Sequence, residues 1–282
     1  MTVPAAPRLT QARAPLTQDV SVQDEFGAQR QITIPAERAL TVFVDNRELV
    51  TLMTLGAAPE LLVLGYLRNQ RLVDAIGDID SITVDWDVDA AAVKTRAGIE
   101  RFDEKTAKRV VTTGCGQGTV FGDLMSELDT LSLPSVDDPS ARLTQASLYG
   151  LLNAMRLQES TYKSAGSVHG CALFRQDELL TFVEDVGRHN AIDTIAGWMW
   201  LHGVTGGDKI FYTTGRLTSE MVIKSAQMGV PVIVSRSGIT QMGYEVARKL
   251  GLCLFGRATN RHFICYCGFE RFDAQPEPAR VE

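Results

Sequence analysis

Cysteine is the most nucleophilic side chain in this sequence of 282 residues, and one of its five cysteines has distinct surroundings. Cys115 lies between Gly114 and Gly116, away from any apolar periodicity. A thiol on such a loop can meet more than one partner, which suits a nucleophile or a group carrier. A loop cysteine without a role is the alternative. Gly118 stands at the second position of a C-x-x-C motif, which argues against disulfide exchange within the chain.

The other four cysteines fall in apolar runs that predict strands. We expect Cys171 and Cys253 to be packing residues, and burial to hide all four thiols and raise their pKa. Cys265 and Cys267 lie on the same side of one predicted strand, but no second close pair completes a metal site. A zinc deaminase needs the motifs H-x-E and P-C-x-x-C. His169-Gly170-Cys171 is the nearest match to the first, and the second is missing. The sequence therefore predicts no metal site.

Three turns, each between a predicted strand and a predicted helix, share one glycine and one arginine. They are Glu184–Asn190, Thr213–Glu220 and Ser235–Thr240. Open α/β sheets bind ligands where strands end, and helix N-termini present free N–H groups to anions. The candidate binding residues are Gly187, Arg188, Gly215, Arg216, Ser219, Ser235 and Arg236. Alternatively, the arginines pair with Glu184, Asp185 and Glu220 on the surface, and Ser219 or Thr218 is only a helix cap.

A fourth candidate segment joins the last two predicted strands and adds two cations, polar groups and an imidazole. Its residues are Arg257, Ala258, Thr259, Asn260, Arg261 and His262. It is either a surface hairpin or a contact to a nucleotide at the same sheet edge. His169 ends the glycine-rich turn SAGSVHG and is a candidate pocket residue, whereas His189 is either a ligand contact or a helix start.

The elements that must position these residues form two predicted domains. Residues 1–30 and 273–282 are polar and predict mobile tails. Residues 31–113 predict a small α+β subdomain, with a hairpin over 39–54, a helix from Pro59 and strands at 81–84 and 109–113. Residues 114–142 predict a mobile cysteine loop and linker, because two clusters of glycine and proline fall there.

Residues 143–272 predict the larger domain. A helix over 144–159 precedes two strands near 168–174 and 179–184, and helices and strands then alternate. Such alternation predicts a largely parallel sheet between helical layers, which the opening hairpin makes mixed. The run VPVIVS is apolar throughout, as in a strand covered on both faces.

Composition excludes several classes of function. Lys and Arg number 28 against 34 Asp and Glu, so the net charge is −6, and tight duplex nucleic-acid binding is not expected. The odd cysteine count gives no disulfide framework, and neither a secretory signal nor a membrane span is evident. We expect a cytoplasmic protein, in which any anion site is a local cluster of arginines or backbone N–H groups.

The segments GCGQG, SAGSVHGCAL, EDVGRHNAID, GRLTSEM and VPVIVSRSGIT resemble the FdhD family of formate dehydrogenase accessory proteins, which are sulfur carriers. The resemblance runs from about Ala39 to about Phe272. It implies a larger three-layer α/β/α domain like that of cytidine deaminase but without zinc, and a homodimer. It also implies a sulfurtransferase that receives persulfide sulfur from a cysteine desulfurase. The sulfur passes to the molybdenum of bis-molybdopterin guanine dinucleotide before the catalytic subunit of formate dehydrogenase takes the cofactor.

In this resemblance Cys115 matches the carrier cysteine, and Arg257 to His262 match the cofactor-binding stretch. GDP or GMP is then a surrogate ligand. Gly118 departs from the family's C-x-x-C motif, and RATNRHF departs from its late glycine-rich segment. Two other functions stay open: a non-catalytic nucleotide or cofactor-binding chaperone for a molybdoenzyme, and, less favoured without zinc, a nucleoside-modifying enzyme.

Overall fold

The computed structural model describes residues 6–99 and 128–275, and these residues divide into two compact units. The first unit contains the described residues up to 99, Glu159–Gly170 and Val183–Val204. The second contains residues 128–158, Cys171–Phe182 and residues 205–275. Neither unit is continuous in sequence, whereas the sequence analysis placed all of 143–272 in one domain. The predicted strand at 109–113 and most of the predicted cysteine loop lie outside the described residues.

The first unit contains a five-stranded sheet. Its order is β1 (Arg8–Leu9), β6 (Ile79–Asp85), β7 (Ala90–Thr95), β4 (Arg38–Val44) and β5 (Arg47–Thr54). The predicted hairpin over 39–54 is confirmed, and Asp45 and Asn46 at its turn have φ of 47° and 66°. Asp and Asn tolerate this left-handed region better than most residues. We did not predict β7, because its sequence AAAVKT contains three alanines and little β propensity.

Much of the stretch expected as an N-terminal tail is ordered. Strand β1 pairs with β6, and Glu60 accepts hydrogen bonds from the Thr10 hydroxyl and the Ala12 N–H, both at 2.7 Å. Strands β2 (Thr17–Gln23) and β3 (Gln29–Pro35) then form a separate antiparallel ribbon. Pro7 and Pro15 fall outside these strands, so they break no pairing.

Two glycines bring helix α1 (Pro59–Asn69) against helix α6 (Arg188–Leu201). A Cβ on Gly65 would lie 1.7 Å from the Asp193 carbonyl oxygen, and a Cβ on Gly197 would lie 2.0 Å from that of Leu61. The two backbones are therefore in direct contact. This packing places α6 in the first unit, although its sequence follows strands of the second.

A six-stranded mixed sheet forms the centre of the second unit, and the boundary between the units falls within its strands β9 and β10. Its order is β10 (Glu178–Asp185), β9 (His169–Arg175), β11 (Ile210–Thr213), β12 (Val232–Ser235), β13 (Cys253–Thr259) and β14 (His262–Cys267). Strands β11, β12 and β13 are parallel, while β9 and β14 run antiparallel to their neighbours. All of β12 is buried, as its apolar sequence predicted.

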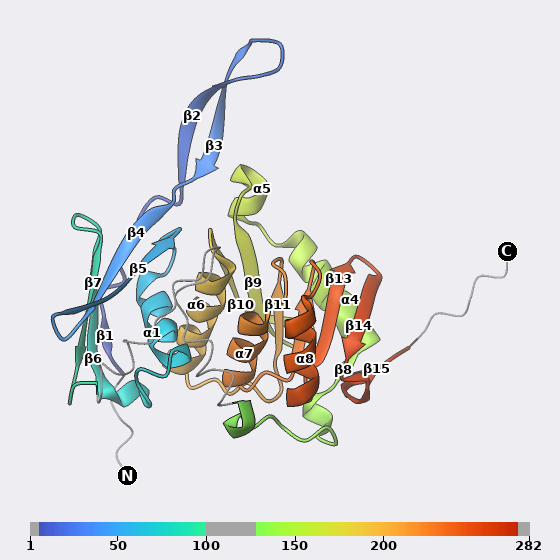
Figure 1. Ribbon diagram of the computed structural model, residues 1–282. Helices are drawn as coiled ribbons and strands as arrows, with labels where there is room; N and C mark the ends of the chain where they lie inside the picture. Colours follow the sequence, from blue (N-terminus) through green and yellow to red (C-terminus); the bar gives the residue numbers. More distant parts are fainter. Residues whose placement is uncertain (1–5, 100–127, 276–282) are drawn as a thin grey trace. The chain divides into compact units, whose positions relative to one another are not determined.

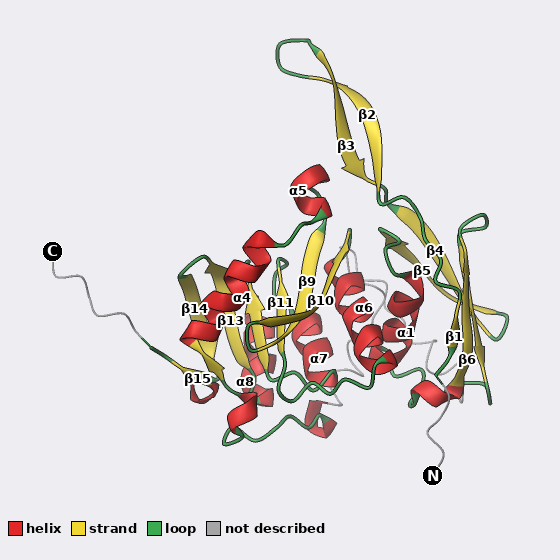
Figure 2. Cartoon of the chain, turned by 180° about the vertical axis from the view of Figure 1, so that it is seen from behind, coloured by secondary structure: helices red, strands yellow, loops and turns green. Residues whose placement is uncertain are grey.

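Helices cover both faces of this sheet in the second unit. Helix α4 (Gln145–Leu157) packs Leu148, Leu151 and Leu152 into a core with Tyr212 and Val234. Helices α7 (Ser219–Gln227) and α8 (Gln241–Leu250) lie on the opposite face, in front in Figure 1, whereas α4 is in front in Figure 2. The predicted alternation of helices and strands in this region is confirmed.

Short elements complete the described chain. They are α5 (Thr161–Ala165), the pair β8 (Leu143–Thr144) and β15 (Phe272–Asp273), and the 3₁₀ helices Ile76–Asp78, Leu128–Thr130, Pro139–Ala141 and Phe269–Arg271. The buried Arg271 guanidinium donates to the carbonyls of Pro134 at 2.7 Å and Gly251 at 2.9 Å. Among the described residues, none of the helices has the length and apolar character needed to cross a membrane.

Candidate functional site

Two of the three arginine-bearing turns are joined at the carboxyl edge of the second unit's sheet. Leu217, which follows β11, donates its N–H to Gly238 O and accepts from Thr240 N–H, each at 3.0 Å. Ser235 links the same turns, because its hydroxyl donates to Gly215 O at 2.7 Å and accepts from Ser237 N–H at 2.9 Å. Ser235 is fully buried and supports the turns from inside.

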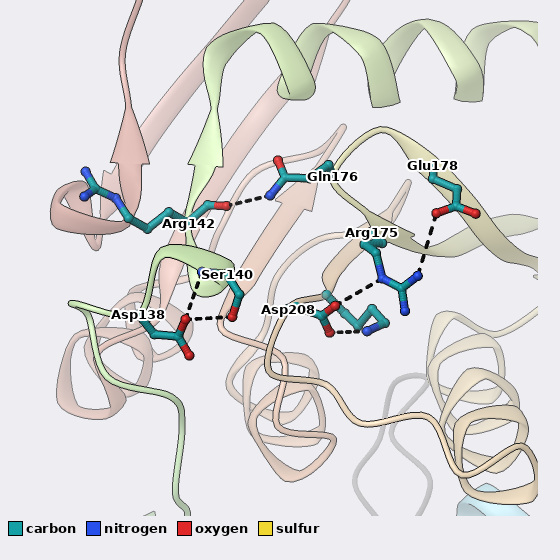
Figure 3. Close-up of polar contacts among 8 residues, drawn as sticks. Asp138, Ser140, Arg142, Arg175, Gln176, Glu178 and Asp208 are labelled. Carbon is teal, nitrogen blue, oxygen red and sulfur yellow. Dashed lines mark hydrogen bonds and ion pairs between the residues drawn. The ribbon is translucent and has the colours of Figure 1, made fainter.

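The arginines of these turns are exposed and lack protein partners in the described part of the chain. Neither Arg216 nor Arg236 forms an ion pair or a side-chain hydrogen bond there. The opposite edge of the same sheet differs, as Figure 3 shows: Arg175 donates to Asp208 at 3.1 Å, and the Lys209 ammonium also contacts Asp208. Arg216 and Arg236 are therefore two cations at the carboxyl edge that no described carboxylate neutralises.

The carboxylates that might have neutralised these arginines are engaged elsewhere. Glu184 accepts the N–H groups of Thr161 at 2.5 Å and Tyr162 at 3.0 Å, at the start of α5. Glu220 pairs with Lys224 at 3.5 Å. The alternative of surface pairing with these acids is therefore wrong for Arg216 and Arg236.

Asp185 is the centre of a buried network in the first unit, and only 3% of the residue is exposed. One carboxylate oxygen accepts from the Thr54 hydroxyl at 2.5 Å and the Leu55 N–H at 3.1 Å. The other accepts from the Gly187 N–H at 3.0 Å and the Asn190 amide at 2.8 Å. Burial raises the pKa of Asp185, and these four hydrogen bonds oppose that rise. The carboxylates of Asp185 and Glu184 are therefore both occupied by donors of the protein itself.

The third turn opens α6 in the first unit. Gly187 is its N-cap and supplies no side-chain cap. Arg188 is only 8% exposed, and its Nε has no hydrogen-bond partner among the described residues. A buried donor of this kind is costly unless a ligand or another group satisfies it. His189 is buried in the first turn of α6, and His169 is half-buried at the start of β9.

The segment from Arg257 to His262 comprises the end of β13, a turn at Asn260 and Arg261, and the start of β14. Asn260 has a φ of 51°, and the Arg257 N–H donates to Ser237 O at 2.7 Å, which ties the segment to the α8 turn. Ala258 is buried, while Thr259, Asn260 and Arg261 are exposed. The Arg261 guanidinium lies 5.7 Å from the centre of the Tyr149 ring.

This turn borders a hollow of about 390 Å³ that helix α4 completes. The hollow is lined by Asn260 and Arg261 and by Tyr149, Asn153 and Arg156 of α4. We did not predict the α4 residues. Their spacing of four and three residues was a signal, because it places them on one helical face, whereas Leu148, Leu151 and Leu152 form the buried one.

The four cysteines within the described residues are not equivalent. Cys171 and Cys253 are fully buried and Cys267 is buried, as predicted; burial raises the pKa of Cys267 to about 11. The Cys253 thiol hydrogen-bonds to Cys265, which raises the pKa of Cys253 and lowers that of the half-buried Cys265. The expectation of a hidden thiol with a raised pKa was therefore wrong for Cys265, because a neighbouring S–H stabilises its thiolate.

Two expectations about the site, the role of Cys115 and the absence of a metal, stay predictions. Cys115 lies outside the described residues, so its role stays a prediction. Within residues 6–99 and 128–275, no group of three or more His, Cys, Asp or Glu side chains is arranged to hold a metal ion. The described geometry is that of two arginine-bearing turns joined at one edge of a sheet.

Comparisons with known proteins place this chain among relatives. The FdhD/NarQ family model matches residues 35–273. A protein of Bacillus licheniformis named sulfur carrier protein FdhD is 30% identical over 243 residues, covering 86% of this chain and 91% of its own. A protein of the same name from Bacillus subtilis is 29% identical over 239 residues, covering 83% and 88%.

A solved structure supports the fold. The crystal structure of a formate dehydrogenase accessory protein from Desulfotalea psychrophila is similar with a TM-score of 0.72 and 23% identity. The match covers 92% of this chain and all of the other. With the family model spanning four strands of the five-stranded sheet, all of the six-stranded sheet and the arginine-bearing turns, the chain belongs to the FdhD/NarQ family.

Proposed function

We propose that this chain is a sulfur carrier that serves the maturation of a formate dehydrogenase. Cys115 accepts sulfur from a cysteine desulfurase and passes it to the molybdenum of bis-molybdopterin guanine dinucleotide, before the catalytic subunit receives that cofactor. The observation that carries the proposal is the family match, which spans Cys115 and whose curated relatives bear the name sulfur carrier.

The proposed chemistry needs a single thiol. The Cys115 thiolate attacks the outer sulfur of the desulfurase persulfide, the S–S bond of the donor breaks, and the donor cysteine leaves as a thiolate. Cys115 then carries a persulfide. Delivery of its outer sulfur breaks the new S–S bond and regenerates the Cys115 thiolate, and the molybdenum, as substrate, supplies the two electrons that convert sulfane sulfur to sulfide. Gly118 in place of a second cysteine is compatible with this cycle.

The guanine dinucleotide portion of the substrate is an anion, and the joined turns after β11 and β12 suit it. Arg216 and Arg236 are exposed cations without competing carboxylates among the described residues, and both turns lead into helix N-termini. We infer that they bind phosphate oxygens. We also propose that the second unit has a deaminase-like arrangement without zinc.

The hollow between α4 and the β13–β14 turn suits another part of the same ligand. Arg156 and Arg261 add two cations, and Tyr149 offers an aromatic face on which a planar base can stack. In the first unit, the unpartnered Nε of Arg188 is a further donor for an anion.

Sulfur loading tests the role of Cys115. After incubation with a desulfurase and cysteine, the intact mass of the wild-type chain should rise by one sulfur atom, and Cys115→Ala should not gain it. Cys265→Ala is the matched control, because Cys265 has the lowered pKa among the described thiols. Loading of Cys115→Ala equal to that of the wild type would contradict the assignment.

Calorimetry with GDP tests the anion edge. Arg216→Ala and Arg236→Ala should each weaken binding by roughly tenfold to a hundredfold, because each removes a charged hydrogen bond to phosphate. Arg175→Ala is the matched control, since this arginine lies at the opposite edge and is paired with Asp208. Equal affinity in all three variants would remove the turns from the site.

Formate dehydrogenase activity in cells separates the alternative function. A non-catalytic chaperone that binds the cofactor would retain GDP binding through the same arginines. It would support an active formate dehydrogenase with Cys115→Ala in cells that lack the native protein, whereas a sulfur carrier would not.

A further inference from the structure

Two neighbouring strands of the second unit's sheet carry three cysteines. Strand β14 lies at the edge of the sheet and pairs with β13 in antiparallel register (Figure 1). Leu254 pairs with Cys267 and Phe255 pairs with Cys265, so Tyr266 is an extra residue in β14. Because successive residues of β13 point to opposite faces, their partners Cys265 and Cys267 do so as well. The extra residue thus separates two cysteines that the sequence placed on one side of the strand.

Cys265 faces the core beneath helix α4 and meets Cys253 there. Cys253 is fully buried in this core, and the partly buried Cys265 packs against it. The thiols of the two residues are joined by a hydrogen bond. Cys267 differs, because its thiol donates to the carbonyl oxygen of Leu252 at 3.4 Å. One pair of thiols is therefore in direct contact, while the third thiol is engaged elsewhere.

The two thiols of this pair differ in reactivity. Their hydrogen bond lowers the pKa of Cys265 and raises that of Cys253. Cys265 is also the more exposed of the two. Because the thiolate is the form that attacks an oxidant, Cys265 reacts first. Cys253 stays protonated and hidden, next to the sulfur that has reacted.

We propose that Cys265 and Cys253 are an oxidisable pair, which a peroxide converts into a disulfide between β14 and β13. The Cys265 thiolate attacks one oxygen of hydrogen peroxide, the O–O bond breaks, and hydroxide leaves, so that Cys265 becomes a sulfenic acid. The Cys253 sulfur then attacks the Cys265 sulfur, the S–O bond breaks, and water leaves with the thiol proton. The two cysteines lose two electrons, which the peroxide gains.

The placement of the two cysteines makes this disulfide easy to reduce. They are diagonal neighbours, because Cys253 lies two residues before Phe255, which is the partner of Cys265. Diagonal Cα atoms are about 7–8 Å apart, whereas a disulfide takes about 4.4–6.8 Å. Strand β14 must therefore shift, which it can do because no described strand pairs with its outer side. A disulfide formed under strain is more reducible, so glutathione should reopen it.

The disulfide would also restrain the hairpin of β13 and β14. The turn at Asn260 and Arg261 lies between the two cysteines in sequence, and both turn residues line the hollow against α4. A cross-link at the base of the hairpin limits the opening of its edge strand. We therefore expect amide hydrogen exchange in β14 to slow when the pair is oxidised.

Peptide mapping without reduction tests the pair. The full chain is treated with a small excess of hydrogen peroxide, its free thiols are blocked, and trypsin then separates Cys253 on Leu250–Arg257 from Cys265 on His262–Arg271. We expect these two peptides to be joined, fragmentation to place the link at Cys265, and glutathione to release them. Cys253→Ala and Cys265→Ala should each abolish the link. Cys267→Ala is the matched control and should keep it.

Dimedone, which traps sulfenic acids, tests the order of the two steps. In Cys253→Ala the oxidised Cys265 lacks its resolving thiol, so its labelling should exceed that of the wild type by about tenfold or more. Circular dichroism should show that Cys253→Ala and Cys267→Ala are folded.

Three results would overturn the proposal. They are the absence of joined peptides in the oxidised wild type, a link at Cys267 instead of Cys265, and equal dimedone labelling of Cys265 in the wild type and in Cys253→Ala. The wild-type mapping requires no variant, so the proposal stays falsifiable if a variant fails to fold. These readouts need neither a desulfurase nor the molybdenum cofactor, so they are independent of sulfur loading on Cys115.

Discussion

At the scale of single residues, the contacts of a sulfur atom decide how reactive a thiol is. Cys265 and Cys267 lie two residues apart on β14, yet the pKa of Cys265 is lowered and that of Cys267 is raised. The difference arises from Cys253 on the neighbouring strand, whose thiol lowers the pKa of Cys265 while its own pKa is raised. A buried cluster of thiols therefore contains one that ionises more readily.

We predict that Cys265 is alkylated by iodoacetamide before Cys253 and Cys267. The thiolate is the reactive form, and Cys265 has both the lowered pKa and the greater exposure. Cys253→Ala should slow this reaction, because it removes the donor that stabilises the thiolate. Peptide mass mapping over time checks both statements, and Cys171→Ala serves as the control. Faster labelling of Cys267 than of Cys265 would contradict the assignment.

Tyr212 on β11 should make the free energy of unfolding decrease at alkaline pH. Burial raises its pKa to about 12 from an ordinary 10.0, and Arg236 opposes that rise. As the pH rises through 10, the unfolded chain releases this proton while the folded chain keeps it, so stability falls. At pH 11 the free energy of unfolding of the wild type should have fallen by about 1.4 kcal/mol through Tyr212, and Tyr212→Phe should not show this part of the loss. Urea unfolding at pH 9 and pH 11 measures the difference, and equal losses would argue against a raised pKa.

At the scale of elements, α1 and α6 depend on two glycines for their contact. We predict that Gly65→Ala destabilises the protein by about 3 kcal/mol or more, because the new methyl group would overlap the Asp193 carbonyl. Gly207→Ala is the control, since its Cβ would come no nearer than 3.9 Å to another residue. Chemical denaturation gives both free energies of unfolding. A loss below about 1 kcal/mol in Gly65→Ala would indicate that the helices separate easily.

At the scale of the whole molecule, each unit has a hydrophobic core of its own. The first core joins Leu40, Val42 and Leu64, and the second joins Leu148, Val234 and Phe255. Units with separate cores can open separately. We predict that Gly65→Ala speeds hydrogen exchange in β4, β6 and β7 but leaves β11, β12 and β13 unchanged. Mass spectrometry of exchanged peptides resolves these strands, and equal acceleration in both units would show that they unfold as one.

The sequence alone determined the features that depend on local patterns. Turn chemistry at Asp45-Asn46 predicted the β4–β5 hairpin, and the apolar periodicity of 145–157 predicted α4 with its buried leucines. The alternation after residue 169 predicted the mixed sheet and placed Arg216 and Arg236 at the ends of strands. These features depend on residues that lie within a few positions of one another in the sequence, so the sequence alone is enough to predict them.

Only the tertiary structure decided which distant groups meet. Thr54 and Asp185 are separated by 131 residues, and their hydrogen bond withdraws Asp185 from ligand binding. Arg175 forms an ion pair with Asp208 at one sheet edge, whereas Arg216 and Arg236 at the other edge form none with any described carboxylate. Close contact between glycines assigned α6 to the first unit. Pairings of this kind are set by the geometry of packing, and the periodicity of a sequence carries no record of which elements become neighbours.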